Sequence, residues 1–499
     1  MFLSIVLVTA VIILLHWTLT RKFSYWKRKG FLNYPGYFPF GTSKELTLVK
    51  RYQGFIHQEL YNKLSPNPFG GIYVWNEPIL FIRDPEIIRL IMVKEFQHFR
   101  DRGRVELSPK QPLSQHLFNL DGDIWRSLRI KLTPTFTSGR LKHMFSLFIN
   151  AASKFDKCAF GLDTTSVEYE EFRKISQVMF IPYIPIKRII GLALYHYFPF
   201  MRRFLDLNGI HKKIEELVFP LILDSVKHRE QNNVRRNDFL DLMIQLQKRG
   251  KLENILLLKS INVHISFIEI TTNLLVAQCF VFIVAGYETS SSVLSFAFYE
   301  LALNQDIQDK LRKEIDEVTK NNGGEVDYQI LNEMHYLDQV ISEVLRKYPT
   351  APLLERKCSK DFIVQNNPEL IIEKGTKVWI PVYSLHHDPK YFKNPDNFDP
   401  DRFSPENKLS IVPFSYLPFG EGPRHCIGMR FGLLQTKLGI YTVISKYKVI
   451  PTEETPKRLN FRPSTLLTRT DQLIQLIIQP RDDLKASTTV ISNENPAAT

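Results

Sequence analysis

The longest uncharged stretch of the sequence lies at its start. Residues 1–20 carry no charged side chain and are mostly apolar. As a helix rising about 1.5 Å per residue, this segment reaches about 30 Å, the thickness of the hydrocarbon core of a bilayer. The pattern predicts one N-terminal transmembrane helix. Because a basic cluster follows, the positive-inside rule places the rest of the chain in the cytosol; the cluster consists of Arg21, Lys22, Lys27, Arg28 and Lys29.

A cleaved signal peptide is the alternative interpretation of this segment. Signal peptides begin with a basic region and end at a small-residue cleavage site of the A-x-A type. The sequence has neither feature, so a retained anchor is favoured. Prolines and glycines then interrupt helix formation, and residues 21–41 are predicted to be a basic hinge; the interrupting residues are Pro35, Gly36, Pro39 and Gly41.

A second long apolar stretch covers residues 267–305. It contains no proline and has apolar side chains on nearly all sides of a helix, which is typical of a helix through the interior of a domain. Inside it lies the run Ala285-Gly286-Tyr287-Glu288-Thr289-Ser290. Glycine costs about 1 kcal/mol relative to alanine, and threonine can bond back to the preceding turn, so a local distortion is expected. A helix-packing contact explains this run equally well on its own.

Composition limits the classes of protein that the chain can represent. Its 499 residues show no internal repeat and no Gly/Ser-rich linker between Thr42 and Pro480, which predicts one large domain over residues 42–480. The apolar content of 44% is ample for a core that encloses a big hydrophobic cofactor. A net charge of +13 without a nucleic-acid motif indicates a membrane surface and an acidic protein partner, and excludes nucleic acid. Residues 481–499 are predicted to be a disordered tail.

The cysteines point to one reactive thiol. Four occur, with no C-x-x-C spacing, so neither a disulfide framework nor a zinc cluster is indicated; they are Cys158, Cys279, Cys358 and Cys426. Cys426 follows a glycine-punctuated turn, in the spacing F-x-x-G-x-R-x-C-x-G, and precedes a helix-like stretch. Arg424, His425 and helix amides are expected to lower the pKa of the thiol. A lone cysteine is usually a buried structural residue, but this spacing favours a thiolate presented to haem iron.

Further positions in the run support this interpretation. Gly420 and Gly422 permit backbone angles that a side chain would block, and Gly428 leaves room for a flat macrocycle. Phe419 is expected to cover the sulfur. With these residues the chain resembles the cytochrome P-450 family of haem-thiolate monooxygenases from about residue 30 to residue 480.

This resemblance implies a mostly α fold with a smaller β region, formed partly near residues 73–82 and 371–380. It implies haem b as cofactor, Cys426 as its axial ligand, and electron donation from sulfur that favours O–O cleavage. The central helix would cross the distal face of the haem, where Thr289 and Glu288 deliver protons during activation of O2, next to Ala285 and Gly286.

The resemblance also assigns structural and haem-binding roles. Glu343 and Arg346, at i and i+3 of a helix, would form a network with Arg402 behind the haem. The haem propionates need cations, and arginine forks match carboxylates well; the residues assigned to the propionates are Trp125, Arg129, Arg356 and Arg424. A surface ion pair for Glu343 and a core aromatic for Trp125 are the plainer alternatives.

Substrate contacts are implied on the distal side, where a pocket would take a lipophilic molecule; the candidates are Phe118, Phe282, Leu353 and Leu466. Residues 192–201 are apolar and aromatic, and are predicted to be a lid at the membrane interface. Residues 112–118, 158–161 and 237–242 look most like the arthropod xenobiotic-metabolising branch. Oxidation of plant toxins or insecticides is therefore implied, and an endogenous steroid or fatty acid is the competing substrate class.

The chain has no G-x-G-x-x-G motif after a strand and no flavin module, so electrons must come from another protein. The resemblance implies NADPH-cytochrome P-450 reductase, with cytochrome b5 as a second donor, at the endoplasmic reticulum membrane. A basic docking surface is predicted at Arg126, Lys131, Lys142 and Lys437. Two other functions stay open: a haem-thiolate isomerase that needs no reductase, and a non-catalytic lipid carrier of similar fold.

Overall fold

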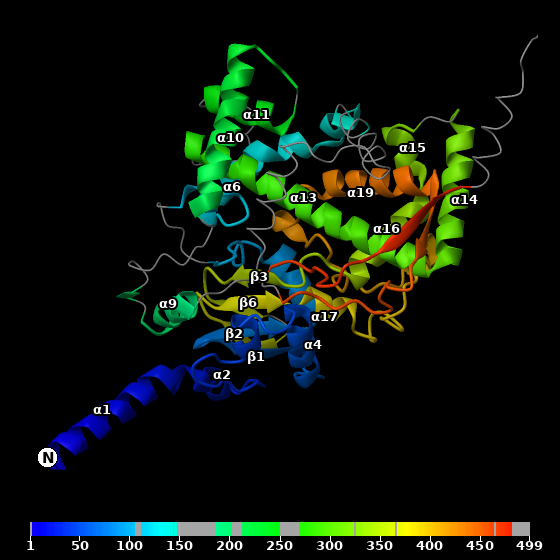
Figure 1. The fold of residues 1–499 in the computed structure, drawn as a ribbon. Helices are drawn as coiled ribbons and strands as arrows, with labels where there is room; N and C mark the ends of the chain where they lie inside the picture. The colour runs from blue at the N-terminus through cyan, green and yellow to red at the C-terminus, as the bar shows by residue number, and fades with distance from the viewer. Residues whose placement is uncertain are drawn as a thin grey trace, which may run out of the picture.

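The computed structural model describes most of the chain. The described residues are 2–104, 111–142, 144–146, 149, 186–198, 200–201, 212–236, 238–249, 269–323, 326–364, 367–463 and 466–481. Residues 482–499 of the predicted tail and the motif at residues 158–161 lie outside them, whereas Arg481 is described and pairs with Asp316 at 2.7 Å. The fold is mostly helical with a smaller β region, as predicted (Figure 1).

Helices make up the larger part of the structure. The α-helices are α1 (Phe2–Thr20), α2 (Tyr25–Arg28), α3 (Lys44–Thr47), α4 (Gln53–Lys63), α5 (Pro85–Arg89), α6 (Gly122–Leu132), α9 (Ile186–Tyr197), α10 (Lys212–Gln231), α11 (Phe239–Arg249), α13 (Thr272–Leu303), α14 (Gln305–Asn321), α15 (Tyr328–Glu333), α16 (His335–Lys347), α17 (Val382–His386), α18 (Pro405–Lys408) and α19 (Met429–Ile444). Short 3-10 turns are η1 (Arg21–Ser24), η3 (Pro112–Ser114), η4 (Thr133–Phe136), η7 (Pro400–Phe403) and η8 (Gly422–Arg424), and η2 (Leu90–Lys94) is a π-helical turn.

The strands form one four-stranded sheet and two hairpin-like pairs. The strands are β1 (Phe69–Val74), β2 (Glu77–Ile82), β3 (Leu354–Lys357), β4 (Phe362–Val364), β5 (Asn367–Ile372), β6 (Lys377–Ile380), β7 (Tyr447–Pro451) and β8 (Leu476–Pro480). The large sheet has the order β1-β2-β6-β3, in which β2 and β6 are parallel and the other pairs antiparallel. Residues 73–82 therefore span the end of β1, a turn and β2, rather than one strand.

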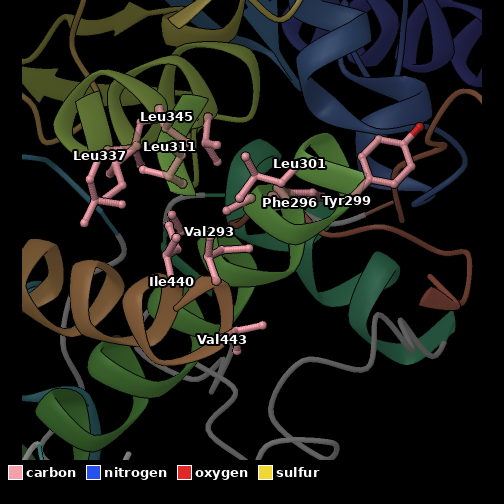
Figure 2. Packing of buried hydrophobic residues seen from close by; sticks show 14 of the residues in the cluster. Val293, Phe296, Tyr299, Leu301, Leu311, Leu337, Leu345, Ile440 and Val443 are labelled. Carbon is pink, nitrogen blue, oxygen red and sulfur yellow. The ribbon is translucent and has the colours of Figure 1, made fainter. Parts of the chain in front are cut away.

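The main hydrophobic core lies where α13, α14, α16 and α19 meet. Figure 2 shows side chains of these helices pointing toward one another, among them Phe296, Leu311, Leu337 and Ile440. A second cluster fills the space between the sheet and its neighbouring helices, and a third joins η3, α6, α10 and α11 to the first half of α13. Helix α13 thus passes from one core to another, which explains why it is apolar nearly all round.

Helix α13 begins later than the sequence pattern indicated. The predicted start was residue 267, whereas the helix begins at Thr272. Thr271 is its N-cap, and its hydroxyl accepts a hydrogen bond from the amide of Leu274 at 3.2 Å. Half of the most apolar window of α13 is buried, unlike that of the N-terminal helix. Hydropathy alone would rank α13 as a second membrane span, and its packing shows a core helix instead.

Helix α1 projects away from the rest of the chain and buries none of its residues (Figure 1). The following segment, predicted as a hinge, is partly helical and docks onto the sheet through Trp26. This side chain is 2% exposed, and its indole nitrogen donates to the carbonyl of Ile72 at 3.2 Å. A Cβ at Gly71 would lie 2.1 Å from the Trp26 ring, so the absence of a side chain there makes room for the indole.

Candidate functional site

Cys426 lies between η8 and α19, on a turn that only glycine allows. Gly422 has a φ of +70°, and a Cβ there would lie 2.0 Å from the carbonyl oxygen of Met92. Gly420 also has a positive φ, of +68°. The amide of Cys426 donates to the carbonyl of Phe419 at 2.9 Å and closes the loop. The two glycines are required by backbone shape, in agreement with the reasoning from the sequence.

The electrostatics of Cys426 differ from the sequence-based prediction. Desolvation raises the pKa of the thiol, and this effect outweighs the amide of Gly428, Arg129 and Arg102, which lower it. Arg424 was expected to act on the sulfur and instead lies over the Trp125 ring, 4.1 Å from its centroid. The Cys426 side chain is exposed, so its sulfur is open to a ligand. A bound metal cation would favour the thiolate, because a coordinated thiol is deprotonated outright.

Two glycines border open space on either side of this site. A Cβ added at Gly286 of α13, or at Gly428 beside the cysteine, would meet no atom of the described residues within 4 Å. Helix α13 packs against α19, the helix that follows the cysteine, yet Ala285 and Tyr287 beside Gly286, and Cys426 near Gly428, are exposed. Space of this kind next to a thiol fits a flat macrocycle.

Two buried arginines carry hydrogen-bond donors with no partner. Arg356 on β3 is almost fully buried, and its Nε has no acceptor among the described residues. Arg424 bonds the carbonyls of Arg100 and Leu120 and the carboxylate of Asp121, but its Nη1 likewise finds no acceptor in that part of the chain. Burial lowers the pKa of each guanidinium to about 10. Buried hydrogen-bond donors without acceptors are costly, and two carboxylates such as the haem propionates would satisfy both.

Arg102 belongs to the same group and was missed by the sequence analysis. Desolvation lowers its pKa well below the usual range, and Arg424, Arg356 and Arg104 repel it electrostatically. Its guanidinium lies 4.1 Å from the centroid of the Phe118 ring. Arg102 lies far from Arg356 and Arg424 in sequence and outside any motif, so composition gave no signal for it. Among these four arginines, the ion pairs in the described part of the chain are Arg424 with Asp121 and Arg104 with Glu355, so positive charge is in excess here.

Trp125 and Arg129 lie on α6, one turn apart, as predicted. Trp125 is buried, and its ring supports Arg424 on one side and packs near Phe96, with centroids 5.9 Å apart. Arg129 is close enough to Cys426 for the two to interact electrostatically. The structure therefore places Trp125 beside the Arg424 cation and Arg129 on the sulfur side.

The run Ala285–Ser290 lies within an unbroken α13. The hydroxyl of Thr289 donates to the carbonyl of Ala285 at 2.6 Å, the back-bond that the sequence predicted. The expected distortion is absent, because α13 is continuous from Thr272 to Leu303. Glu288 is buried and forms an ion pair with Arg469, a partner 181 positions away that no local pattern could reveal.

Glu343, Arg346 and Arg402 come together in one buried network. Arg346 grips the Glu343 carboxylate with two nitrogens at 2.7 and 2.8 Å, and both side chains are fully buried. Arg402 from η7 adds a contact of 3.3 Å to the same carboxylate. His386 accepts the amide of Leu417 at 2.8 Å, and its other ring nitrogen lies 3.1 Å from the carbonyl of Arg346. The network thus connects to the segment just ahead of the cysteine loop.

The four candidate substrate residues lie in different surroundings. Phe118 is 37% exposed and held by arginines. Phe282 belongs to an aromatic group, with centroids 4.2 Å from Phe239 and 5.1 Å from Phe136. Leu353 packs against the second core cluster, and Leu466 is partly exposed. Phe282 therefore has packing partners of its own on α11 and η4.

One residue of the predicted basic surface is misplaced. Lys437 is only 5% exposed, and its ammonium pairs with Asp338 at 2.8 Å and donates to the carbonyl of Leu331. It faces the interior of the helix bundle, because position 437 falls on the buried side of α19. Lys142 is exposed and Arg126 half-buried, so the prediction for Lys437 is wrong.

Comparison with known proteins agrees with this site. The sequence model of the family "Cytochrome P450" matches residues 40–159 and 156–478. The chain is 36% identical to cytochrome P450 6a2 of Drosophila melanogaster, covering 94% of this chain and 98% of that protein. It is 36% identical to cytochrome P450 6k1 of Blattella germanica, over 93% and 95% of the two chains, and to cytochrome P450 6B2 of Helicoverpa armigera, over 96% and 98%. Members use haem with a cysteine thiolate ligand in monooxygenase chemistry. The chain belongs to the cytochrome P450 family.

Proposed function

We propose that this protein is a membrane-anchored monooxygenase that inserts one oxygen atom of O2 into lipophilic compounds, with electrons from NADPH through a reductase. The observation that carries the proposal is the pair of buried arginine donors without acceptors, Arg356 Nε and Arg424 Nη1, next to the Cys426 loop. A carrier of similar fold without haem gains nothing from burying donor groups without acceptors, since each costs free energy.

The residues around the open space would hold haem in defined ways. Cys426 is the thiolate ligand, and Gly428 and Phe419 shape the surface around the sulfur. Arg356, Arg424, Trp125 and Arg102 bind the propionates. When bound, haem supplies the redox chemistry and the activation of O2.

The protein side of proton handling falls to two residues of α13. The Thr289 hydroxyl presents its oxygen as an acceptor while its proton is held by the carbonyl of Ala285. Glu288 is a buried carboxylate that forms an ion pair with Arg469. When the ion pair opens, such a carboxylate can take up a proton and pass it on through water. Glu288 would then be the residue that supplies protons to the Thr289 hydroxyl.

A lipophilic substrate is consistent with a catalytic domain held at a membrane surface, where such compounds concentrate. Helix α1 is long and apolar enough to cross a membrane, and we place it in the endoplasmic reticulum with the catalytic domain in the cytosol. The segment that follows α1 exposes the apolar side chains Leu32, Tyr37 and Phe38, and Ile190 and Phe200 are exposed on and just after α9. Helix α9 is tied to the same region, because the hydroxyl of Tyr197 donates to the carbonyl of Pro39 at 2.5 Å. This surface supports membrane contact of the region predicted as a lid.

The substrate class we favour is foreign lipophilic compounds such as plant toxins and insecticides. The support is the similarity to P450 6 proteins from three insects. An endogenous steroid or fatty acid is the competing class. A spectral titration of the purified protein with members of both classes separates them, because a substrate that displaces water from the iron shifts the Soret band.

The reduced protein should give a CO difference band displaced to long wavelength, as a thiolate-ligated haem does. Cys426→Ser should abolish the band, whereas Cys358→Ser, a change at a buried cysteine of the sheet region, should keep it. A displaced band in Cys426→Ser refutes the ligand assignment. Absence of any Soret band in the unmodified protein favours the carrier. Substrate-dependent NADPH oxidation with added reductase excludes the isomerase.

A further inference from the structure

The loop from Gln115 to Phe118 carries Phe118, one of the four candidate substrate residues. It follows η3 and precedes α6, and η3 packs directly on α13. Leu113 and Leu117 are buried in the third core cluster together with residues of α13, whereas Phe118 points elsewhere and is 37% exposed. The loop therefore has an apolar side that is anchored in the core and an aromatic side chain that is partly exposed.

Gln278 on α13 joins the helix to this loop. Its Oε1 accepts the amide of Leu117 at 2.9 Å, and its Nε2 donates to the carbonyl of Gln115 at 3.1 Å and to the carbonyl of Leu274 in its own helix at 3.3 Å. The side chain is 0% exposed. A buried amide surrounded by Leu274, Leu275 and Cys279 of α13 persists only because its bonds are made.

The bonds require both halves of an amide. One loop residue offers a carbonyl and the other an N–H, so the partner must donate and accept at once. An aliphatic side chain does neither and leaves both backbone groups unsatisfied. A carboxylate keeps the acceptor but turns a negative oxygen toward the carbonyl of Gln115.

The other end of the loop is held by Arg102. Its Nη1 donates to the carbonyl of Phe118 at 2.6 Å, and its guanidinium stacks on the Phe118 ring. Arg104 lies over the same ring, 4.8 Å from the centroid. With Gln278 fixing residues 115 and 117 and Arg102 fixing residue 118, the backbone that carries the ring is held from both sides.

We propose that Gln278 is a positioning residue that sets Phe118, and through it the size of lipophilic ligand that the site accepts. It acts through the loop and does not touch the ligand. The inference rests on the proposed function, since it takes Phe118 as a wall of the substrate space.

Gln308 offers a matched control. It is also a buried amide, 0% exposed, that donates to two backbone carbonyls, those of Leu301 and Val449, at 2.8 Å each, and accepts the amide of Val449 at 3.0 Å. It ties β7 to α14, in the part of the fold built by the first core cluster. Its Oε1 also accepts from Arg312 at 3.1 Å. Gln308→Met therefore removes one more hydrogen bond than Gln278→Met, and in a different part of the fold.

Hydrogen exchange of the full-length protein is the first measurement. In Gln278→Met the amides of residues 115–120 should exchange about 30-fold faster, because two loop hydrogen bonds worth about 1 kcal/mol each are lost and about 1.4 kcal/mol corresponds to tenfold. Gln308→Met should leave these amides unchanged. Unchanged exchange in Gln278→Met overturns the proposal.

Azole binding to the ferric haem is the second measurement. Imidazole is too small to reach the wall, so its dissociation constant should stay within about twofold in both variants. That of the bulky azole clotrimazole should rise about tenfold in Gln278→Met alone. Equal effects of the two variants on clotrimazole refute the positioning role.

A test on the unmodified protein covers the case in which Gln278→Met does not fold. Clotrimazole, unlike imidazole, should slow exchange of residues 115–120, and equal effects of the two azoles contradict the wall assignment. If the proposed function is wrong, the unmodified protein gives no displaced CO band. If the band is normal but Gln278→Met and Gln308→Met behave alike in exchange and in azole binding, only the role of Gln278 is refuted.

Discussion

Replacing Glu343 with glutamine tests the buried network behind the cysteine loop. The carboxylate of Glu343 is fully buried and accepts four hydrogen bonds: two from Arg346 at 2.7 and 2.8 Å, one from the amide of Asp399 at 3.0 Å and one from Arg402 at 3.3 Å. An amide has one oxygen to offer in place of two, and its NH2 group faces arginine donors. The change leaves the buried Arg346 cation without a counter-charge.

The expected loss is large on the scale of protein stability. Removing one partner of a buried ion pair costs about 3–5 kcal/mol, whereas whole proteins are stable by about 5–15 kcal/mol. The three backbone carbonyls around Arg346, those of His386, Pro395 and Asn397, keep their bonds, so we expect the lower part of this range, about 3 kcal/mol.

Chemical unfolding followed by tryptophan fluorescence measures the effect. Asp401→Asn is the matched control, since it also converts a carboxylate to an amide, but in an exposed pair with Lys310 at 2.6 Å. Exposed pairs contribute about 0–1 kcal/mol. If Glu343→Gln and Asp401→Asn lose equal stability, the network does not hold a buried charge and the reasoning is refuted.

Three further predictions concern the haem side. Gly422→Ala should lower the free energy of unfolding by more than about 2 kcal/mol, because Gly422 has a φ of +70° and the Met92 carbonyl lies close to it. Gly428→Ala should change the free energy of unfolding of the haem-free protein by less than about 0.5 kcal/mol, but it should lower haem retention, measured as the Soret-to-protein absorbance ratio. Arg356→Met should reduce haem retention yet stabilise haem-free protein by about 1 kcal/mol in urea, since it removes a buried cation; a loss in both assays contradicts the assignment. In haem-free protein the pKa of the Cys426 thiol is raised by desolvation, so less thiolate exists at a given pH. Alkylation of Cys426 by iodoacetamide should therefore reach half its maximal rate above about pH 8.5, the midpoint of an ordinary thiol. A midpoint below that pH refutes this prediction.

The features predicted correctly were those that local spacing encodes. The cysteine loop depends on glycines that the chain backbone itself requires, and Glu343 and Arg346 meet because residues three apart share a helix face. The long apolar helix α13 and the apolar N-terminal helix follow from composition over many residues. In each case the physical cause lies within about one element of the chain.

The features missed or mistaken depend on pairs far apart in sequence. Arg102, Arg469 and Gln278 gain their roles from partners on other elements, which no periodicity reveals. Lys437 was placed on the surface because lysine is usually exposed, whereas the turn of α19 that carries it faces Asp338. The pKa of Cys426 was misjudged because positive neighbours are visible in a sequence and desolvation is not.

The docked indole of Trp26 decides how a soluble form of this enzyme should be made. Deleting residues 1–20 removes the apolar helix α1 and keeps the indole packed over Gly71, with its bond to the carbonyl of Ile72. Deleting ten more residues would remove Trp26 and expose the apolar surface of β1 that it covers. Such a shortened protein should aggregate in buffer without detergent, although every residue assigned to haem binding is intact.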